Sequence, residues 1–180
     1  LYRGGNICLD GFFQSYKYFE VYESEIRDLF KYSDEIKEYI LKKYGKFLDK
    51  RTVSVHIRRR DYLQLPKDYI KLDKTYYDKA LSVVSNKIDV ILVFSDDIKW
   101  CKENFSGGNF IFIENEKDYI DLYLMSMCNH NIISNSSFSW WGAWLNQDKE
   151  KVVIAPEKWF GPNKGDRNLD DLLMDDWILI

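Results

Sequence analysis

Two hydrophobic periodicities alternate along the chain from residue 52 onward. Apolar residues take every second position of Thr52–Ile57, and residues 90–94 form a continuous apolar run. The first pattern is typical of a strand, and the second of a strand covered on both faces. Further strands are predicted at 110–113, 131–134 and 152–155, with intervening helices at 73–84, 97–104, 119–128 and 138–145. Five strands separated by helices favour an α/β fold with a parallel, Rossmann-like sheet.

The first 50 residues follow a different pattern and contain no predicted sheet. A helix is predicted from 34 to 44, capped by Ser33 and stopped by Gly45. We therefore expect two parts: residues 1–50 as the end of an N-terminal domain, and residues 51–180 as a Rossmann-like domain. Because the first residue is leucine rather than methionine, we also expect the natural N-terminus to lie upstream or to have been removed.

The composition is that of a folded domain with a balanced charge. Hydrophobic residues make up 46% of the 180 residues and aromatic residues 17%, which favours a packed core over disorder. With 26 basic and 29 acidic residues, the net charge of -3 argues against a nucleic-acid partner. No stretch approaches the length of apolar sequence that a transmembrane helix needs.

The cysteine and histidine residues do not form a metal-binding pattern. Cys8, Cys101 and Cys128 are scattered, and His56 and His130 are the only imidazoles. A structural zinc site is therefore not expected. We interpret all three cysteines as ordinary buried thiols, consistent with a reducing compartment, and His130 as a core residue.

Three arginines follow the first predicted strand, where parallel sheets bind their ligands. Arg58, Arg59 and Arg60 come directly after the strand that contains His56. Guanidinium groups match phosphate oxygens in pairs, so the run is a candidate clamp for a diphosphate. The alternative is a solvated basic turn, because basic runs are usually surface features.

Two further polar segments lie at predicted strand ends. Asp96 and Asp97 can either cap the next helix or accept hydrogen bonds from N1 and N2 of a guanine base. A second segment offers backbone N–H groups at a helix start to an anion, or is simply a capped, buried tryptophan-rich helix. Its candidate binding residues are Asn135, Ser136, Ser137, Phe138 and Ser139.

Two motifs are absent from the sequence. Without a G-x-G-x-x-G or Walker loop, the predicted sheet is not an obvious NAD or ATP binder. There is also no Asp-x-Asp triplet of the kind that holds a metal and a sugar diphosphate. We therefore expect no metal and no cofactor, and a departing diphosphate would have to be neutralised by arginines.

Together these segments resemble glycosyltransferase family 11, the α-1,2-fucosyltransferases. Residues 56–61 match the H-x-R-R-x-D motif that this family shares with α-1,6- and protein O-fucosyltransferases. Residues 94–97 (FSDD) and 121–146, which include N-S-S-F-S-W-W, are similar to two further family segments. The resemblance covers nearly the whole chain. The opening G-G-L-G-N-Q motif of the family is absent, so the chain resembles an N-terminally incomplete member.

The resemblance implies a GT-B fold in which residues 51–180 bind GDP-fucose and residues 1–50 end the acceptor-side domain. It implies inverting transfer of fucose to the 2-hydroxyl of a galactose-containing glycan, without a metal. By motif match, Arg58 and Arg59 would contact the diphosphate and His56 would shape the same site. Asp96, or second Asp97, would bind guanine. The nucleotide cleft would be lined by Asn135, Ser136, Ser137, Phe138 and Ser139.

The general base and the exact function stay open. Asp61 is the nearest carboxylate to the arginines, although it could instead pair with Arg59 or Arg60, and Asp68 is a weaker candidate. The alternative functions are a fucosyltransferase of another linkage class, acting on protein or core N-glycan, and a non-catalytic GDP-sugar-binding fragment. We expect a bacterial cytoplasmic location, with peripheral association at the inner membrane; the alternative is the Golgi lumen. No oligomeric state is predicted.

Overall fold

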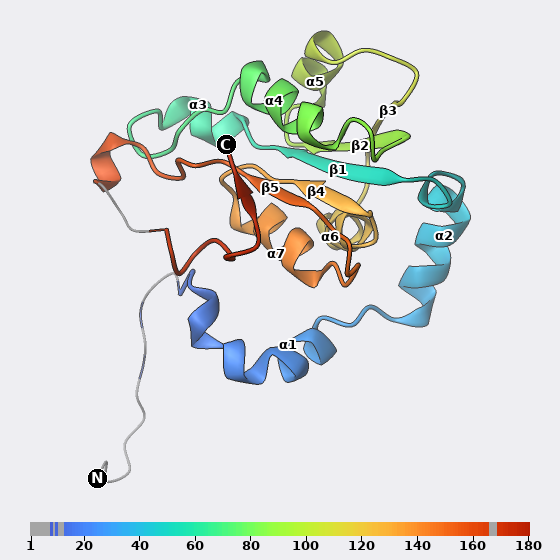
Figure 1. Cartoon of the computed structure of the whole chain (residues 1–180), viewed down its shortest axis with the longest axis horizontal. Helices are drawn as coiled ribbons and strands as arrows, with labels where there is room; N and C mark the ends of the chain where they lie inside the picture. Colours follow the sequence, from blue (N-terminus) through green and yellow to red (C-terminus); the bar gives the residue numbers. More distant parts are fainter. Residues whose placement is uncertain (1–7, 9, 11–12, 166–168) are drawn as a thin grey trace, which may run out of the picture.

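A computed structural model of the chain describes residues 8, 10, 13–165 and 169–180. Its centre is one sheet whose strands lie in the order β3-β2-β1-β4-β5-β6, with every neighbouring pair parallel (Figure 1). The strands are β1 (Thr52–Ile57), β2 (Val90–Ser95), β3 (Phe110–Phe112), β4 (His130–Ile132), β5 (Val153–Ala155) and β6 (Ile178–Leu179). The predicted parallel α/β sheet is confirmed. Because the strand order reverses between β1 and β4, a crevice is expected at their carboxyl ends.

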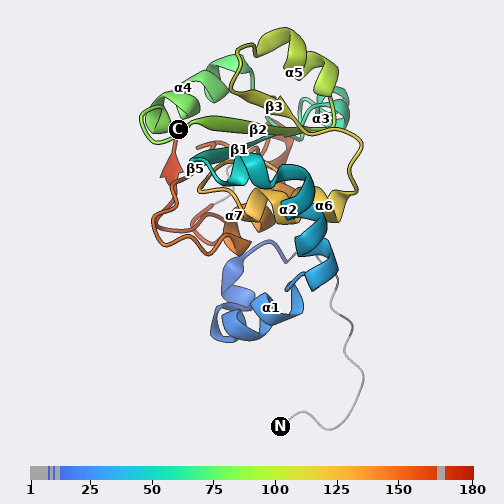
Figure 2. The same ribbon diagram turned by 90° about the vertical axis from the view of Figure 1, so that its right-hand side faces the viewer.

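Helices cover both faces of this sheet. They are α1 (Glu23–Leu29), α2 (Asp34–Leu48), α3 (Arg60–Gln64), α4 (Lys74–Val84), α5 (Ile98–Asn104), α6 (Asp118–Ser126) and α7 (Ser137–Leu145). Short 3₁₀ helices are η1 (Tyr16–Tyr18), η2 (Glu20–Tyr22) and η3 (Pro162–Lys164). Figures 1 and 2 show α4 and α5 on one face and α2, α6 and α7 on the other. Among the helices of the described ranges, none is long and apolar enough to cross a membrane.

The core is divided by the sheet because successive side chains of a strand point to opposite faces. On the α4 and α5 face, Val53 and Val55 of β1 pack against Tyr77 and Ala80. On the other face, Leu92 of β2 belongs to a cluster with residues of α2 and α6. Both sides of the central strands are therefore buried, which explains the continuous apolar run of β2, whereas β1 also buries the polar residues Thr52, Ser54 and His56.

Helix α2 shares its core with the sheet. Ile40 and Tyr44 are buried in the same cluster as Val90, Leu92 and Phe94. The proposed domain boundary at residue 50 stays a prediction, but these contacts tie α2 to the Rossmann-like part of the chain.

Tryptophan residues of α7 join the segment before α2 to the sheet. Trp141 stacks between Phe19 and Phe30, with ring centroids 5.3 and 4.9 Å away. The guanidinium carbon of Arg27 lies 3.9 Å from the centroid of the Trp144 ring, and its Nη1 donates to the Trp144 carbonyl at 2.8 Å. The tryptophan-rich helix is thus mainly a packing surface.

Helix α2 does not end where its glycine predicted. The N-cap is confirmed, since Ser33 accepts a hydrogen bond from the Ile36 N–H. The prediction that Gly45 stops the helix is wrong, because the helix continues to Leu48. Phe47 and Leu48 pack against the core cluster of this face. Burying an apolar side chain is worth about 1.5–3 kcal/mol, which exceeds the ~1 kcal/mol that a helical glycine costs.

Helix α1, the 3₁₀ helices η1 and η2 and two further short elements were not predicted. The prediction of five strands is wrong by one, since the final apolar segment contributes β6, which pairs with β5 through Ile178 and Leu179. Helix α3 is the second, and it begins within the arginine run. Both elements are too short to show a hydrophobic period, and both depend on contacts with residues distant in sequence.

The cysteine prediction holds for two of three residues. Cys101 and Cys128 are buried thiols, but Cys8 is exposed, so the prediction that all three are buried is wrong. Cys8 precedes the segment that packs on α7. His130 is buried and its Nδ1 accepts a hydrogen bond from the Val152 N–H at 3.1 Å, which confirms it as a core residue.

Candidate functional site

A cleft of about 530 Å³ opens at the carboxyl ends of β1, β2 and β4. This is the crevice that the strand order predicts. Its wall is formed by β-strand ends and by the first turns of α3, α6 and α7. The lining residues are His56, Arg58, Asp61, Tyr62, Tyr69, Phe94, Ser95, Asp96, Asp118, Asp121, Ser136, Ser137 and Phe138.

A second hollow of about 360 Å³ lies between α1, the start of α2 and α6. Its lining mixes cations such as Arg27 and Lys37 with Asp28 and Asp34. It lies away from the carboxyl ends of the strands, where parallel sheets bind their ligands. The cleft at the strand ends is therefore the candidate site.

Arg58 is the arginine that faces the cleft. Its Nη2 donates to Oδ2 of Asp61 at 2.8 Å, and its Nε lies 3.4 Å from Oδ2 of Asp96. The prediction that Asp61 pairs with Arg59 or Arg60 is wrong, since its partner is Arg58. This hydrogen bond holds the pKa of Asp61 below its ordinary value. With its side chain 37% exposed, the guanidinium is oriented by two carboxylates and still open to a ligand.

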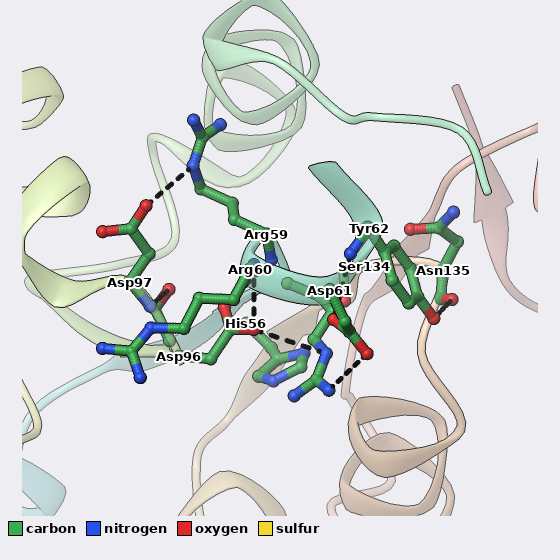
Figure 3. A network of polar contacts seen from close by, with 11 residues as sticks. His56, Arg59, Arg60, Asp61, Tyr62, Asp96, Asp97, Ser134 and Asn135 are labelled. Carbon is green, nitrogen blue, oxygen red and sulfur yellow. Dashed lines mark hydrogen bonds and ion pairs between the residues drawn. The ribbon is translucent and has the colours of Figure 1, made fainter. Parts of the chain in front are cut away.

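Arg59 points elsewhere. Its side chain is 7% exposed, its guanidinium carbon lies 3.8 Å from the Trp100 ring centroid, and its Nε is 3.3 Å from Oδ2 of Asp97. Figure 3 shows this side chain directed away from Asp61 and Tyr62. The structure thus does not bring Arg59 to the cleft, and its predicted contact with a diphosphate stays untested.

The two aspartates after β2 are engaged with protein groups. Asp96 accepts hydrogen bonds from the backbone N–H groups of Arg59 at 2.9 Å and Arg60 at 3.1 Å, so it caps the start of α3. Asp97 accepts from the Trp100 N–H at 3.2 Å and thereby caps α5. Asp96 lines the cleft and Asp97 does not. The predicted contacts of Asp96 and Asp97 with guanine stay untested. In the structure, each of their four carboxylate oxygens already has a partner within the protein.

His56 forms a neutral part of the cleft floor. Its Nδ1 lies 2.9 Å from Oγ of Ser134, and its ring centroid is 5.5 Å from that of Phe138. Burial, and secondarily the charge of Arg58, lower the pKa of His56 to about 3. The imidazole is therefore uncharged at neutral pH and can serve as a hydrogen-bonding group.

The start of α7 opens into the cleft through Ser136, Ser137 and Phe138. Within the described residues, no side chain caps this helix, so its first N–H groups remain available to an anion. Asn135 and Ser139 do not line the cleft. The Asn135 amide donates to the Ile70 and Trp159 carbonyls at 3.0 and 2.8 Å, and the Ser139 hydroxyl donates to the Ser136 carbonyl at 3.2 Å.

Six residues that line the cleft were not among the predicted site residues: Tyr62, Tyr69, Phe94, Ser95, Asp118 and Asp121. Asp121 of α6 lines the cleft, and among the described side chains its Oδ1 is buried without a hydrogen-bond partner. Burial, followed by the charges of Glu116 and Asp118, raises the pKa of Asp121 to about 7. Tyr62 and Tyr69 stack with ring centroids 4.2 Å apart and planes 7° from parallel. In the sequence, Asp121 resembles any polar residue of an amphipathic helix. Its position in the cleft could therefore not be predicted from the neighbouring residues.

A comparison with models of protein families identifies the family of the chain. The family model described as Glycosyl transferase family 11 matches residues 2–180. The chain belongs to glycosyl transferase family 11. The predicted family is thereby confirmed.

Curated relatives of the chain are bacterial and mammalian. The O-antigen biosynthesis glycosyltransferase WbnK of Escherichia coli is 38% identical over 95% of this chain, and an α-1,2-colitosyltransferase of Escherichia coli is 33% identical over 98%. Human galactoside α-(1,2)-fucosyltransferase 1 is 30% identical over 76% of the chain. The chain spans 60%, 63% and 42% of the lengths of these relatives.

A solved structure shares the fold. The structure of POFUT1 in complex with GDP-fucose matches with a TM-score of 0.52 and 16% sequence identity. The match covers 68% of this chain and 46% of the POFUT1 chain. At this identity the likeness concerns the fold alone. The predicted fold class, an α/β Rossmann-like sheet of the GT-B type, is confirmed by this likeness and by the six parallel strands.

Proposed function

We propose that this chain forms the GDP-fucose-binding part of a bacterial α-1,2-fucosyltransferase that acts on a galactose-containing glycan. Its membership of family 11 and the names of its relatives support this proposal. The α-1,2 linkage is common to the names of the fucosyl- and colitosyltransferase relatives. Transfer of colitose is therefore the second candidate, and a comparison of the two donors would separate them.

One observation carries the proposal: Arg58, the start of α7 and Asp121, whose Oδ1 has no hydrogen-bond partner among the described residues, line one cleft. A guanidinium and a helix N-terminus together provide the positive charge that a diphosphate needs. In the transfer step the bond between the anomeric carbon and the β-phosphate oxygen breaks, and negative charge develops on GDP. Preorganised donors at that position stabilise the transition state. In this proposal the protein itself provides these groups, and no metal is required.

Asp121 is the carboxylate that we assign to the guanine base. An ionised carboxylate can accept hydrogen bonds from both N1–H and the N2 amino group of guanine. The oxygens of Asp96 already accept from two backbone N–H groups, whereas Oδ1 of Asp121 has no partner among the described residues. A base that donates two hydrogen bonds would offset the cost of ionising a buried carboxyl group.

Asp61 stays the candidate general base in this proposal. It lies in the cleft and is held by Arg58 at 2.8 Å. The lowered pKa that results keeps Asp61 ionised but makes it a weak base. Asp68, the weaker candidate, lies 3.7 Å from Nζ of Lys164 and does not line the cleft. A loose transition state with little base assistance fits this arrangement.

Calorimetry tests donor binding independently of turnover, which matters because the chain is shorter than its relatives. We expect GDP and GDP-fucose to bind the wild-type chain. The Arg58→Lys variant should lose about tenfold or more in GDP affinity, because an ammonium cannot form a bidentate contact. Arg60→Lys is the matched control, since Arg60 is exposed and does not line the cleft. Equal GDP affinity of both variants would overturn the assignment of Arg58.

A GDP-release assay with GDP-fucose and lactose then tests transfer. Release above the rate of donor hydrolysis supports fucosyltransfer to a galactoside. Donor binding without release supports the alternative of a non-catalytic donor-binding fragment. A screen with glycoprotein acceptors tests the remaining alternative, a fucosyltransferase of another linkage. The Escherichia coli O-antigen relative supports a role in bacterial surface polysaccharide synthesis in the cytoplasm, which fractionation of a bacterial host would test.

A further inference from the structure

A stacked pair of tyrosines forms one end of the cleft. The rings of Tyr62 and Tyr69 are nearly parallel, with centroids 4.2 Å apart. Both residues line the cleft, although Tyr62 itself is buried and Tyr69 is half-buried. Tyr69 is therefore the outer ring of the pair, and Tyr62 supports it from behind.

The pair is held firmly by the surrounding backbone. The Tyr62 hydroxyl donates to the Asn135 carbonyl at 2.9 Å, immediately before the start of α7, as Figure 3 shows. Tyr69 forms an antiparallel bridge with Phe160, and the Gly161 N–H donates to the Asp68 carbonyl at 2.8 Å. A Cβ atom on Gly161 would lie 2.6 Å from the Lys67 carbonyl oxygen. This close approach needs glycine, and it places the loop that carries Tyr69 in one position.

The tyrosine pair and Asp121 belong to elements on opposite faces of the sheet. Asp121 belongs to α6, on the face of the sheet that α2 and α7 share, whereas Tyr62 belongs to α3 and Tyr69 to the α3–α4 loop on the other face. Arg58 follows β1 and the start of α7 follows β4, so both lie at the carboxyl ends of the strands, where the two faces meet. In a nucleotide sugar the diphosphate separates the base from the sugar. A base at Asp121 and a diphosphate at Arg58 therefore direct the sugar toward the tyrosines.

We infer that Tyr69 is a specificity-determining residue whose ring, backed by Tyr62, receives the transferred 6-deoxyhexose. This inference rests on the proposed function. An aromatic face offers apolar contact area with a fixed orientation, and the C–H groups of a pyranose ring fit such a face. A 6-deoxy sugar carries a methyl group where other hexoses carry a hydroxymethyl group. That methyl can contact the ring without leaving a hydroxyl unpaired.

The test compares binding of GDP and GDP-fucose by calorimetry in the wild-type chain, Tyr69→Ala and Tyr69→Phe. We expect Tyr69→Ala to bind GDP within about twofold of wild type but to lose about three- to tenfold in GDP-fucose affinity, the value of one aromatic contact. It should also lose preference for GDP-fucose over GDP-mannose. Tyr69→Phe keeps the ring and should resemble the wild type. Tyr18→Ala, at an exposed tyrosine outside the cleft, is the matched control.

The outcomes distinguish a failure of the proposed sugar contact from a failure of the proposed donor binding. If Tyr69→Ala binds GDP normally and keeps the wild-type ratio of GDP-fucose to GDP affinity, the sugar contact is refuted while the nucleotide site stands. A change confined to the acceptor KM would likewise refute it and assign the ring to the acceptor. If the wild-type chain binds no GDP, both proposals fail. Equal unfolding midpoints in urea for Tyr69→Ala and wild type exclude a folding defect as the cause.

Discussion

Replacing Asp121 by asparagine should stabilise the fold and weaken nucleotide binding at the same time. Asp121 lies half-buried in the cleft, and its Oδ1 has no hydrogen-bond partner among the described residues. Burial is the main cause that raises its pKa from 3.8 to about 7, and the charges of Glu116 and Asp118 add to it. Asparagine has the same shape without the charge, so it removes the cost of the buried anion.

The size and sign of the effect follow from the pKa. Between pH 3.8 and about 7 the folded chain binds more protons at this group than the unfolded chain, so stability falls as the pH rises through this window. The full shift corresponds to about 4 kcal/mol. Since the group is partly exposed to solvent, we expect about 2 kcal/mol. Asp121→Asn should therefore raise the free energy of unfolding by about 2 kcal/mol at pH 8 and by little at pH 4.

Urea denaturation at several pH values between 4 and 8 measures this difference. Asp28→Asn, the same change at an exposed position of α1 outside the cleft, is the control. If wild type and Asp121→Asn lose the same stability between pH 4 and pH 8, the carboxyl group is not perturbed by burial. The explanation of its raised pKa would then be wrong.

The same substitution tests the proposed base contact. An asparagine presents only one acceptor, so GDP affinity should fall by about 10- to 100-fold, the value of a charged hydrogen bond. Wild type should prefer GDP to inosine diphosphate, which lacks the N2 amino group, and the variant should lose this preference. Because the ionised form accepts the base, GDP affinity of the wild type should rise as the pH increases through about 7. Unchanged GDP affinity in Asp121→Asn would exclude the contact.

Three further substitutions test structural roles. Asp96→Ala removes the cap of α3 and should lower the free energy of unfolding by about 1–3 kcal/mol, measured in urea, whereas a purely ligand-binding role would leave it unchanged. Glu116→Gln weakens the contact with the Tyr44 hydroxyl at 2.6 Å and should cost about 1–2 kcal/mol by thermal unfolding; no loss would show that this contact is dispensable. Arg27→Ala should increase protease cleavage around α1, because it removes the contact with Trp144; an unchanged cleavage rate would contradict that role.

The pattern of the sequence was sufficient for five of the six strands and for the location of the candidate site. The continuous apolar run of 90–94 and the alternating apolar residues of 52–57 could both be recognised locally as strands. Local capping could also be predicted, because Ser33 and Asp97 bond N–H groups only three residues away. Parallel strands bring their carboxyl ends to one edge, and this alone placed the candidate cleft.

The tertiary structure decided which of the adjacent polar residues face that cleft. Arg58 and Arg59 are neighbours in the motif, yet the first lines the cleft and the second stacks on Trp100, 41 positions away in the numbering. Asp96 caps α3 across a separation of 37 residues, and Asp121 was indistinguishable from an exposed helical carboxylate. The roles of these side chains depend on their burial and on hydrogen-bond partners from other elements. Both are set by distances in the folded chain and not by positions in the sequence. The sequence could therefore predict the elements and the chemistry of the site, and only the packed structure could distribute that chemistry among its residues.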